Sequence, residues 1–344
     1  MAVNKELVLV TGATGFIGFR TLIETLKAGY RVRAAVRNQG GIDKIKKAAS
    51  TQAYLGQLEF VLVPDILKED AYREAVVHVD YIIHLSSPTT NLEREPSTDE
   101  EIEKMLIQPA VKGTMNMIEA ASTYSPTTKR MVITSSIVAI VEWPEMHMET
   151  GNVFNEQSRT ENIHGPFGGL FPAYGRGKVA ALNATEEYMR TQKPHFEINH
   201  IGPSFTVGKD ELATTRAEIL AGTNGAALGH VVGAAKGMKT PSSSVFVNDV
   251  ARMHVLALDP RIAGGQFFLG VSEGSNTRWE EAFDTVRKHF PKAVESGIFP
   301  LNGDNTTKRL IFDNEYTKRV LKIEFANFEE QVKSVAEQYL ALEN

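Results

Sequence analysis

The chain has 344 residues, with 42 acidic and 37 basic side chains and a formal net charge of −5. This length suits one large domain or two intimate ones, and the lack of a basic excess argues against nucleic-acid binding. There is no cysteine, which excludes disulfides, thiolate metal sites and cysteine nucleophiles. No apolar run reaches roughly 18 residues and the first strand follows closely on Met1, so we expect a cytoplasmic protein with no membrane span or signal peptide. The nine histidines show no HExxH motif or i,i+4 pair, so no metal site is expected either.

The chain begins with a strand, a glycine turn and a helix. Residues 7–10 are continuously apolar, which predicts a strand buried on both faces. Gly12, Gly15 and Gly18 follow, and a helical pattern then runs to Gly29. Strand, glycine turn and helix together are typical of a dinucleotide site, where the turn and the helix N-terminus receive the pyrophosphate. Because the spacing is GxxGxxG, a turn without a ligand is the alternative.

A second strand is expected over 31–36, with Arg37 directly after it. At this place an acid would hold the ribose 2′-hydroxyl of NAD, whereas an arginine suits the 2′-phosphate of NADP. A basic helix over 43–55 follows, and a solvated face is the alternative interpretation of its lysines. Arg37 therefore favours NADP.

Strands and helices continue to alternate up to residue 204, which predicts an α/β fold of the Rossmann type, a doubly wound parallel sheet. Further strands are expected over 60–63, 81–85, 130–135 and 196–201, and helices over 70–77, 98–121 and 172–190. Pro109 predicts a kink near Gln108. The irregular stretch 142–172 has a length at which loops are usually functional.

Beyond residue 204 the alternation ends. A strand end and helix are expected over 245–258, a strand over 266–269, and helices over 276–290, 313–321 and 325–342. We therefore expect an NADP-binding Rossmann domain over 1–204, to which 245–270 returns, and a smaller, mostly helical substrate-binding part built from 205–244 and 271–344. The cleft should lie between this part and the carboxyl edge of the sheet.

Tyr174 and Lys178 lie four residues apart in a predicted helix, so they share one face. An ammonium near a phenol favours the phenolate, so we expect Lys178 to lower the pKa of Tyr174 and make it an acid or base near neutral pH. Ser135 and Ser136 end the preceding strand, where a hydroxyl can hold a substrate carbonyl oxygen. The Tyr–Lys spacing also occurs by chance, and its position after the fifth strand is what singles it out.

The chain resembles the extended short-chain dehydrogenases/reductases over nearly its whole length. The motifs that carry the resemblance are Thr11–Gly18 (TGATGFIG), Ser135–Ser136, Tyr174–Lys178 (YGRGK) and Phe246–His254 (FVNDVARMH). Val36–Arg37, Lys44 and His84–Pro88 (HLSSP) are similar to the NADPH-dependent branch that contains dihydroflavonol, cinnamoyl-CoA and methylglyoxal or aldehyde reductases.

The resemblance implies NADP(H) as cofactor and a set of residues around it. Those residues are Gly12, Thr14, Gly15, Phe16, Ile17 and Gly18 at the pyrophosphate, Arg37 and Lys44 at the 2′-phosphate, Asp65 and Ile66 at the adenine, Leu85, Ser86 and Ser87 at the nicotinamide ribose, and Pro203 at the nicotinamide. Ser136, Tyr174 and Lys178 are implied as catalytic, with Tyr174 and Lys178 also on the ribose and Ser135 serving the cofactor. We expect the substrate walls at Thr89, Ile137, Phe171 and Phe205, with ordinary core as the alternative for Ile137 and Phe171.

Three functions remain open. The first is an NADPH-dependent carbonyl reductase for a ketone or aldehyde, with Tyr174 as proton donor. The second is a nucleotide-sugar epimerase or dehydratase, or a hydroxysteroid dehydrogenase/isomerase, of the same fold. The third is a non-catalytic NADP-binding sensor, whose relatives tend to lack the Tyr–Lys pair. The only partner expected is a small carbonyl or alcohol substrate, for a monomer or homodimer. Gln108 and Phe154–Ser158 depart from the family pattern, and the second departure leaves the substrate class open.

Overall fold

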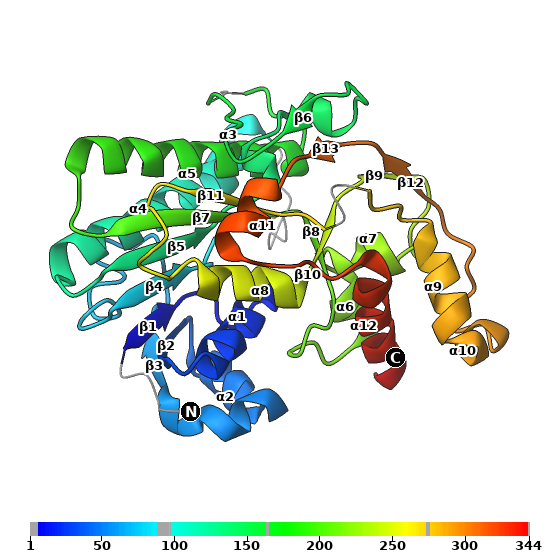
Figure 1. The fold of residues 1–344 in the computed structure, drawn as a ribbon, viewed down its shortest axis with the longest axis horizontal. Helices are drawn as coiled ribbons and strands as arrows, with labels where there is room; N and C mark the ends of the chain where they lie inside the picture. The colour runs from blue at the N-terminus through cyan, green and yellow to red at the C-terminus, as the bar shows by residue number, and fades with distance from the viewer. Residues whose placement is uncertain (1–5, 88–95, 97, 163–164, 273–275, 343–344) are drawn as a thin grey trace.

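The computed structural model describes residues 6–87, 96, 98–162, 165–272 and 276–342. Within these ranges seven strands form one parallel sheet in the order β11–β7–β5–β4–β1–β2–β3 (Figure 1). Their bounds are β1 Leu7–Val10, β2 Arg31–Val36, β3 Leu58–Leu62, β4 Tyr81–His84, β5 Arg130–Thr134, β7 Glu197–Pro203 and β11 Phe267–Gly270. The strand order reverses between β1 and β4, and in such sheets ligands bind at this reversal. The prediction of a doubly wound parallel sheet is confirmed.

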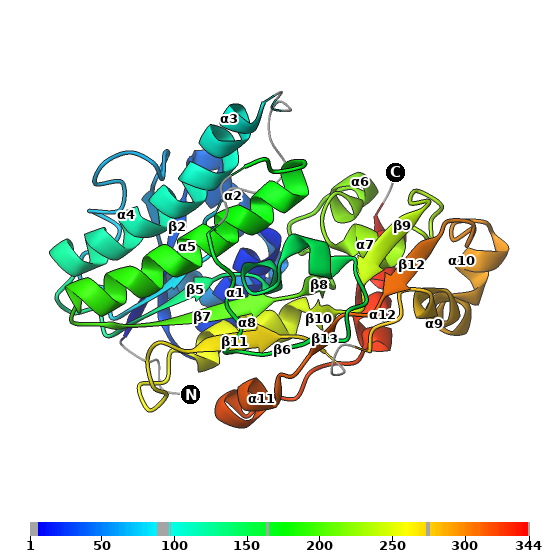
Figure 2. The same cartoon turned by 90° about the horizontal axis from the view of Figure 1, so that it is seen from above.

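Alternating side chains of β1 explain the layers on both faces of the sheet. Val8 and Val10 pack into the apolar cluster that contains α1 (Phe16–Lys27) and α8 (Val247–Leu256). Leu7 and Leu9 point the other way, into the cluster under α4 (Gln108–Tyr124). Figure 2 shows α4 and α5 (Leu170–Gln192) side by side across that second face. Every residue of β1 is therefore buried, as the continuous apolar run predicts.

Two predicted helices differ from the structure. Residues 70–77 form consecutive turns instead of a helix, so that prediction is wrong; Asp70 (φ 55°) and His78 (φ 60°) take left-handed backbone angles at its two ends. The predicted helix 98–121 is divided into α3 Asp99–Ile102, a π-helical turn Glu103–Ile107 and α4 Gln108–Tyr124. Pro109 lies in the first turn of α4, where its missing N–H costs least. The division lies where the kink was predicted.

The other elements differ from prediction mainly at their ends. The basic helix is α2 Gln39–Lys47, followed by a 3₁₀ segment Ala49–Gln57. The tail contains α6 Arg216–Leu220, α7 Asn224–Leu228, α9 Glu281–His289, α10 Pro291–Glu295 and α12 Phe328–Ala341. These helices share an apolar core in which Trp279 and Phe299 are fully buried. None of the described helices is long and apolar enough to cross a membrane.

Within the described residues, three short parallel strand pairs join distant segments: two lie within the tail, and the third joins the tail to the stretch between β5 and α5. Their members are β8 Phe205–Val207 with β10 Ser244–Phe246, β9 Met238–Pro241 with β12 Asn305–Lys308, and β6 Val153–Phe154 with β13 Ile311–Phe312. Figure 1 shows this tail beside the sheet. The domain boundaries after residues 204, 244 and 270 stay a prediction.

The stretch between β5 and α5 is held by the tail. The carboxylate of Glu156 is buried and accepts hydrogen bonds from the backbone N–H (3.0 Å) and hydroxyl (2.6 Å) of Thr317. Thr317 belongs to α11 Glu315–Leu321, which follows β13. A long-range strand pair and a buried carboxylate therefore fix a segment that looks irregular in sequence.

Candidate active site

The glycine turn between β1 and α1 leaves space that side chains would fill. Gly12 has a φ of +65°, and a Cβ added to it would lie 3.0 Å from the carbonyl carbon of Leu85. A Cβ on Gly18 would collide with the carbonyl oxygen of Gly12. Gly15 is the N-cap of α1 and supplies no side-chain hydrogen bond to the first N–H groups of the helix. The turn therefore fits a pyrophosphate at a helix N-terminus.

Thr11 joins this turn to the end of β4. Its hydroxyl accepts hydrogen bonds from the N–H groups of Leu85 (3.0 Å) and Ser86 (3.1 Å), and lies 3.0 Å from Nδ1 of His84. Since both lone pairs of the hydroxyl are used, its proton points to Nδ1, and the neutral imidazole carries its own proton on Nε2. Burial lowers the pKa of His84 to about 3, so the ring is neutral. Ser86 and Ser87 are thereby held beside the glycine turn.

Tyr174, Lys178 and Ser136 come together at the carboxyl end of β5. Ser136 follows that strand and caps a 3₁₀ turn, Ile137–Ala139, by accepting the N–H of Val138 at 3.3 Å. Its hydroxyl also lies close enough to the Tyr174 phenol to lower the pKa of that group. One turn along α5, Lys178 Nζ lies 5.7 Å from the centre of the Tyr174 ring and donates to the carbonyl oxygen of Thr134 at 3.4 Å.

Burial dominates the protonation of this group. It raises the pKa of Tyr174 to about 12, although the nearby hydroxyl of Ser136 acts in the opposite direction. Burial also lowers the pKa of Lys178 to about 8. The expectation that Lys178 lowers the pKa of Tyr174 is therefore wrong for the protein alone, because loss of solvent around the phenol outweighs any attraction from the ammonium. At neutral pH the phenol keeps its proton.

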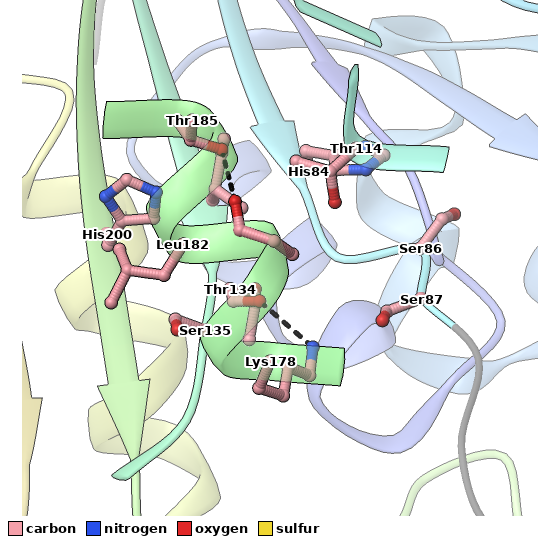
Figure 3. A pocket seen from close by; sticks show the side chains of 12 residues that line it. His84, Ser86, Ser87, Thr114, Thr134, Ser135, Lys178, Leu182, Thr185 and His200 are labelled. Atoms are coloured by element: carbon pink, nitrogen blue, oxygen red, sulfur yellow. Dashed lines mark hydrogen bonds between the residues drawn. The ribbon is translucent and has the colours of Figure 1, made fainter. Parts of the chain in front are cut away.

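A cavity of about 10 Å³ lies behind Lys178, between the ends of β4 and β5 and the helices α4 and α5 (Figure 3). This is the space one water molecule needs. His84, Thr114, Thr185 and His200 are among its polar lining residues. The Nε2 atoms of His84 and His200 are buried, and within the described part of the chain they have no hydrogen-bond partner. Burial also lowers the pKa of His200 to about 3, so both rings are neutral and the cavity has a polar but uncharged lining apart from Lys178.

A second network fixes β5 from the opposite side. The Thr134 hydroxyl lies 2.7 Å from Nε2 of His254, whose Nδ1 lies 2.7 Å from the carbonyl oxygen of Val250. Burial lowers the pKa of His254 to about 4, so its ring is neutral; Nδ1 donates to the carbonyl and Nε2 accepts from the hydroxyl. The motif ending at His254 therefore supports the strand end that receives Lys178.

The residues expected at the adenosine end lie around α2 and the end of β3. Arg37 is exposed directly after β2 and has no hydrogen bond or ion pair with the described residues. Lys44 lies close enough to Asp210 and Glu218 of the tail to affect the pKa of both carboxyls. Asp65 accepts the N–H of Leu67 at 2.8 Å, which orders the turn after β3.

Ser135, Ile66 and Pro203 lie near the same edge of the sheet. The Ser135 N–H donates to Ile201 of β7 at 2.7 Å, and its side chain lines the cavity behind Lys178. The carbonyl oxygen of Ile66 accepts the side-chain amide of Asn116 on α4 at 2.8 Å. Pro203 ends β7 opposite Gly270 of β11.

The four expected substrate residues are not alike. Thr89 lies outside the described residues. Ile137 is 1% exposed within an apolar core, so the alternative of an ordinary core residue holds for it. Phe205 is half-buried at the start of β8 and contacts the Trp279 ring edge-on at 5.8 Å. Phe171 is 40% exposed, with its ring centre 6.0 Å from that of Tyr174.

Trp143 is a neighbour that the sequence patterns did not single out. Its ring centre lies 5.2 Å from Phe171 and 4.7 Å from His147. Trp143, Phe171 and Tyr174 thus form a continuous aromatic row that leads to the phenol. His200 and Thr185 also escaped notice, because a single polar residue in an apolar strand or helix gives no periodic signal.

The comparisons with known proteins agree with this geometry. A model of the "NAD dependent epimerase/dehydratase family" matches residues 8–270. The chain is 35% identical to ketoreductase CTB6 of Cercospora beticola, over 98% of this chain and 96% of that protein. It is 32% identical to NAD-dependent epimerase/dehydratase FUM13 of Gibberella moniliformis, over 99% and 97%.

A solved structure shares the fold. The yeast methylglyoxal/isovaleraldehyde reductase Gre2, complexed with NADPH, superposes with a TM-score of 0.80 at 22% identity, over 97% of this chain and 98% of that one. The match of the family model and the relatives above 30% identity show that the chain belongs to the NAD-dependent epimerase/dehydratase family, the extended short-chain dehydrogenases/reductases, and is an NAD(P)-dependent oxidoreductase.

Proposed function

We propose that the protein is an NADPH-dependent reductase of ketones or aldehydes. The observation that carries this proposal is that Tyr174 lies close to Ser136 and to the buried Lys178, whose Nζ is 5.7 Å from the centre of the Tyr174 ring. When bound, the nicotinamide supplies a hydride to the carbonyl carbon. The ketoreductase relatives support this reaction class.

The three side chains have separate tasks in this reaction. The Ser136 hydroxyl donates a hydrogen bond to the substrate carbonyl oxygen, which polarises the carbonyl. The Tyr174 phenol gives its proton to that oxygen as negative charge develops there. Lys178 binds the cofactor ribose and stabilises the phenolate that remains. Because burial keeps the pKa of Tyr174 at about 12, the phenol starts protonated, which suits reduction better than oxidation.

Arg37 supports the choice of NADPH over NADH. Its guanidinium is exposed beyond the end of β2 and has no described ion pair, so it is available to a 2′-phosphate. Lys44 is the second candidate, and its charge also acts on the carboxyl groups of Asp210 and Glu218.

The substrate side favours an uncharged or aromatic carbonyl compound. Trp143 and Phe171 provide apolar surface next to Tyr174, and Phe205 is the third candidate wall. Sugar dehydratases of this fold usually carry acids after the catalytic serine position, whereas residues 137–140 here are buried and apolar. This argues against a nucleotide-sugar substrate.

The test is consumption of NADPH with a panel of aldehydes, α-keto esters, diketones and aryl ketones. We expect turnover with at least one class, and a larger loss of kcat in Ser136→Ala than in the neighbouring control Ser135→Ala. No turnover with any class, using either NADPH or NADH, would refute the proposal. A larger loss in Ser135→Ala would exchange the roles of the two serines.

A further inference from the structure

A second cavity lies on the opposite side of α5 from the catalytic pair. It has a volume of about 80 Å³ and is lined by Val138, Val141, Trp143, Pro172, Arg176 and Val179, with Glu142 and Glu161 among its remaining members. Arg176 is two residues from Tyr174, which places the two side chains about 200° apart around the helix. The cavity therefore does not belong to the face that carries Tyr174 and Lys178.

Arg176 is the unusual residue of this lining. Its Nε and Nη1 atoms are buried and have no hydrogen-bond partner among the described residues. The side chain as a whole is half-buried, but N–H groups that are buried without an acceptor are costly, because they have lost water and gained no hydrogen bond in exchange. An anion that reached these atoms would restore the lost hydrogen bonds as charge-assisted ones, which are the stronger kind.

The two acids of the lining do not satisfy Arg176. Glu142 and Glu161 are exposed, and neither forms an ion pair with Arg176 in the described structure. Their charges remain in solvent and are screened there, whereas the unpartnered N–H groups lie out of solvent. We therefore expect a ligand that is small enough to enter between the carboxylates of Glu142 and Glu161 and to bring its negative charge next to the guanidinium of Arg176.

The remaining walls define the body of the ligand. Val138, Val141, Pro172 and Val179 present apolar surface, and the volume corresponds to about five to eight water molecules. We propose that this cavity binds a small free carboxylate with a short apolar body, the size of isovalerate. Its carboxylate accepts hydrogen bonds from Nε and Nη1 of Arg176, and its body lies against the valines.

Trp143 connects this cavity with the substrate side. It lines the cavity and also lies 5.2 Å from Phe171, whose ring in turn lies 6.0 Å from that of Tyr174. A bound carboxylate therefore contacts one end of the aromatic row and leaves the other end to the carbonyl substrate. Binding itself does not depend on the proposed reaction.

Trp143 also provides the measurement. The chain has two tryptophans, and Trp279 is fully buried in the core of the tail. We expect isovalerate to change the tryptophan emission of the full-length protein in a saturable way, and isovaleramide, a neutral molecule of the same shape, to bind at least tenfold more weakly. Trp143→Phe should remove the emission change while isovalerate binding persists by ligand-observed NMR.

Arg176→Met should abolish isovalerate binding, and Arg176→Lys should restore part of it. The matched control is Arg190→Met on the same helix, since Arg190 is exposed and paired with Glu187. Equal binding of acid and amide to the wild-type protein would overturn the proposal even if Arg176→Met fails to fold. No saturable binding in either measurement, or purely competitive inhibition by isovalerate against a carbonyl substrate, would also overturn it.

Discussion

On the cofactor side of the candidate active site, Gly12, Tyr174 and Lys178 lie in or beside elements that form from local sequence patterns and meet at one edge of a parallel sheet. On the substrate side, the stretch between β5 and α5 takes its shape from contacts far along the chain, such as Glu156 with Thr317, 161 residues apart. The positions of the residues on the cofactor side therefore follow from the sheet and the elements next to it. The substrate side can change its shape when distant residues change, so one fold can serve different substrates.

Lys178 offers the strongest test of the cofactor side. Its pKa is lowered from 10.5 to about 8, so between these pH values the unfolded chain holds a proton that the folded protein has released. The unfolding free energy of the wild type relative to Lys178→Met should therefore rise with pH across this window, by about 3 kcal/mol at about 1.4 kcal/mol per pKa unit. Urea unfolding at pH 7.5 to 10 measures this, with the exposed Lys46→Met as control. A pH-independent difference would mean that Lys178 is not desolvated.

Arg37 should have the next largest effect, on cofactor choice. Arg37→Asp removes charge-assisted hydrogen bonds to the 2′-phosphate, each worth about 1.5–3 kcal/mol, so NADPH affinity should fall about tenfold to a hundredfold while NADH affinity holds or rises. Titration of both cofactors measures this. Arg31→Asp makes the same charge change at the opposite end of β2 and should leave the ratio unchanged. A wild type that binds NADH as tightly as NADPH would contradict the role of Arg37.

Glu156 tests whether the substrate side depends on its distant support. Glu156→Ala leaves the N–H and hydroxyl of Thr317 without their acceptor, which should cost about 1–3 kcal/mol of unfolding free energy. KM for the carbonyl substrate should rise while the dissociation constant of NADPH stays the same. The exposed Glu161→Ala on the same stretch is the stability control. Equal damage to NADPH binding would show that the two sides are not independent.

Phe171 should give the smallest effect, confined to substrate preference. Phe171→Ala removes an aromatic neighbour of Tyr174 and Trp143, and such contacts are worth about 0.5–1.5 kcal/mol, so KM for bulky aryl ketones should rise about two- to tenfold. KM for a small aliphatic aldehyde should change less. Ile298→Ala, with 39% exposure against 40% for Phe171, is the control. An unchanged ratio of the two KM values would place the substrate elsewhere.

The difference between the cofactor side and the substrate side also explains which features could be predicted from the sequence. The strand before the glycine turn, the turn itself and the Tyr174–Lys178 spacing are local patterns that can be read from neighbouring residues, and the structure brings them together at one edge of the sheet. The false helix over 70–77 has helical composition, but the left-handed angles of Asp70 and His78 leave no trace in a pattern of apolar residues.

On the substrate side, the sequence patterns predicted less of the structure than they did on the cofactor side. Glu156 looks like a solvated acid in a polar loop, and only Thr317 in the folded chain makes it a buried anchor. Trp143 occurs in no motif, and its contact with Phe171 depends on how the stretch folds back on α5. The pKa of Tyr174 was predicted in the wrong direction for the same reason, because burial is set by tertiary structure.

The most direct test of the central claim is the hydride-transfer rate of Tyr174→Phe in a single turnover with saturating NADPH. Loss of a general acid should lower this rate by about 10²- to 10⁴-fold, while the dissociation constant of NADPH changes little. Tyr188→Phe, on the same helix but packed against the sheet, should keep the wild-type rate. A Tyr174→Phe protein that transfers hydride at nearly the wild-type rate would contradict Tyr174 as the proton donor.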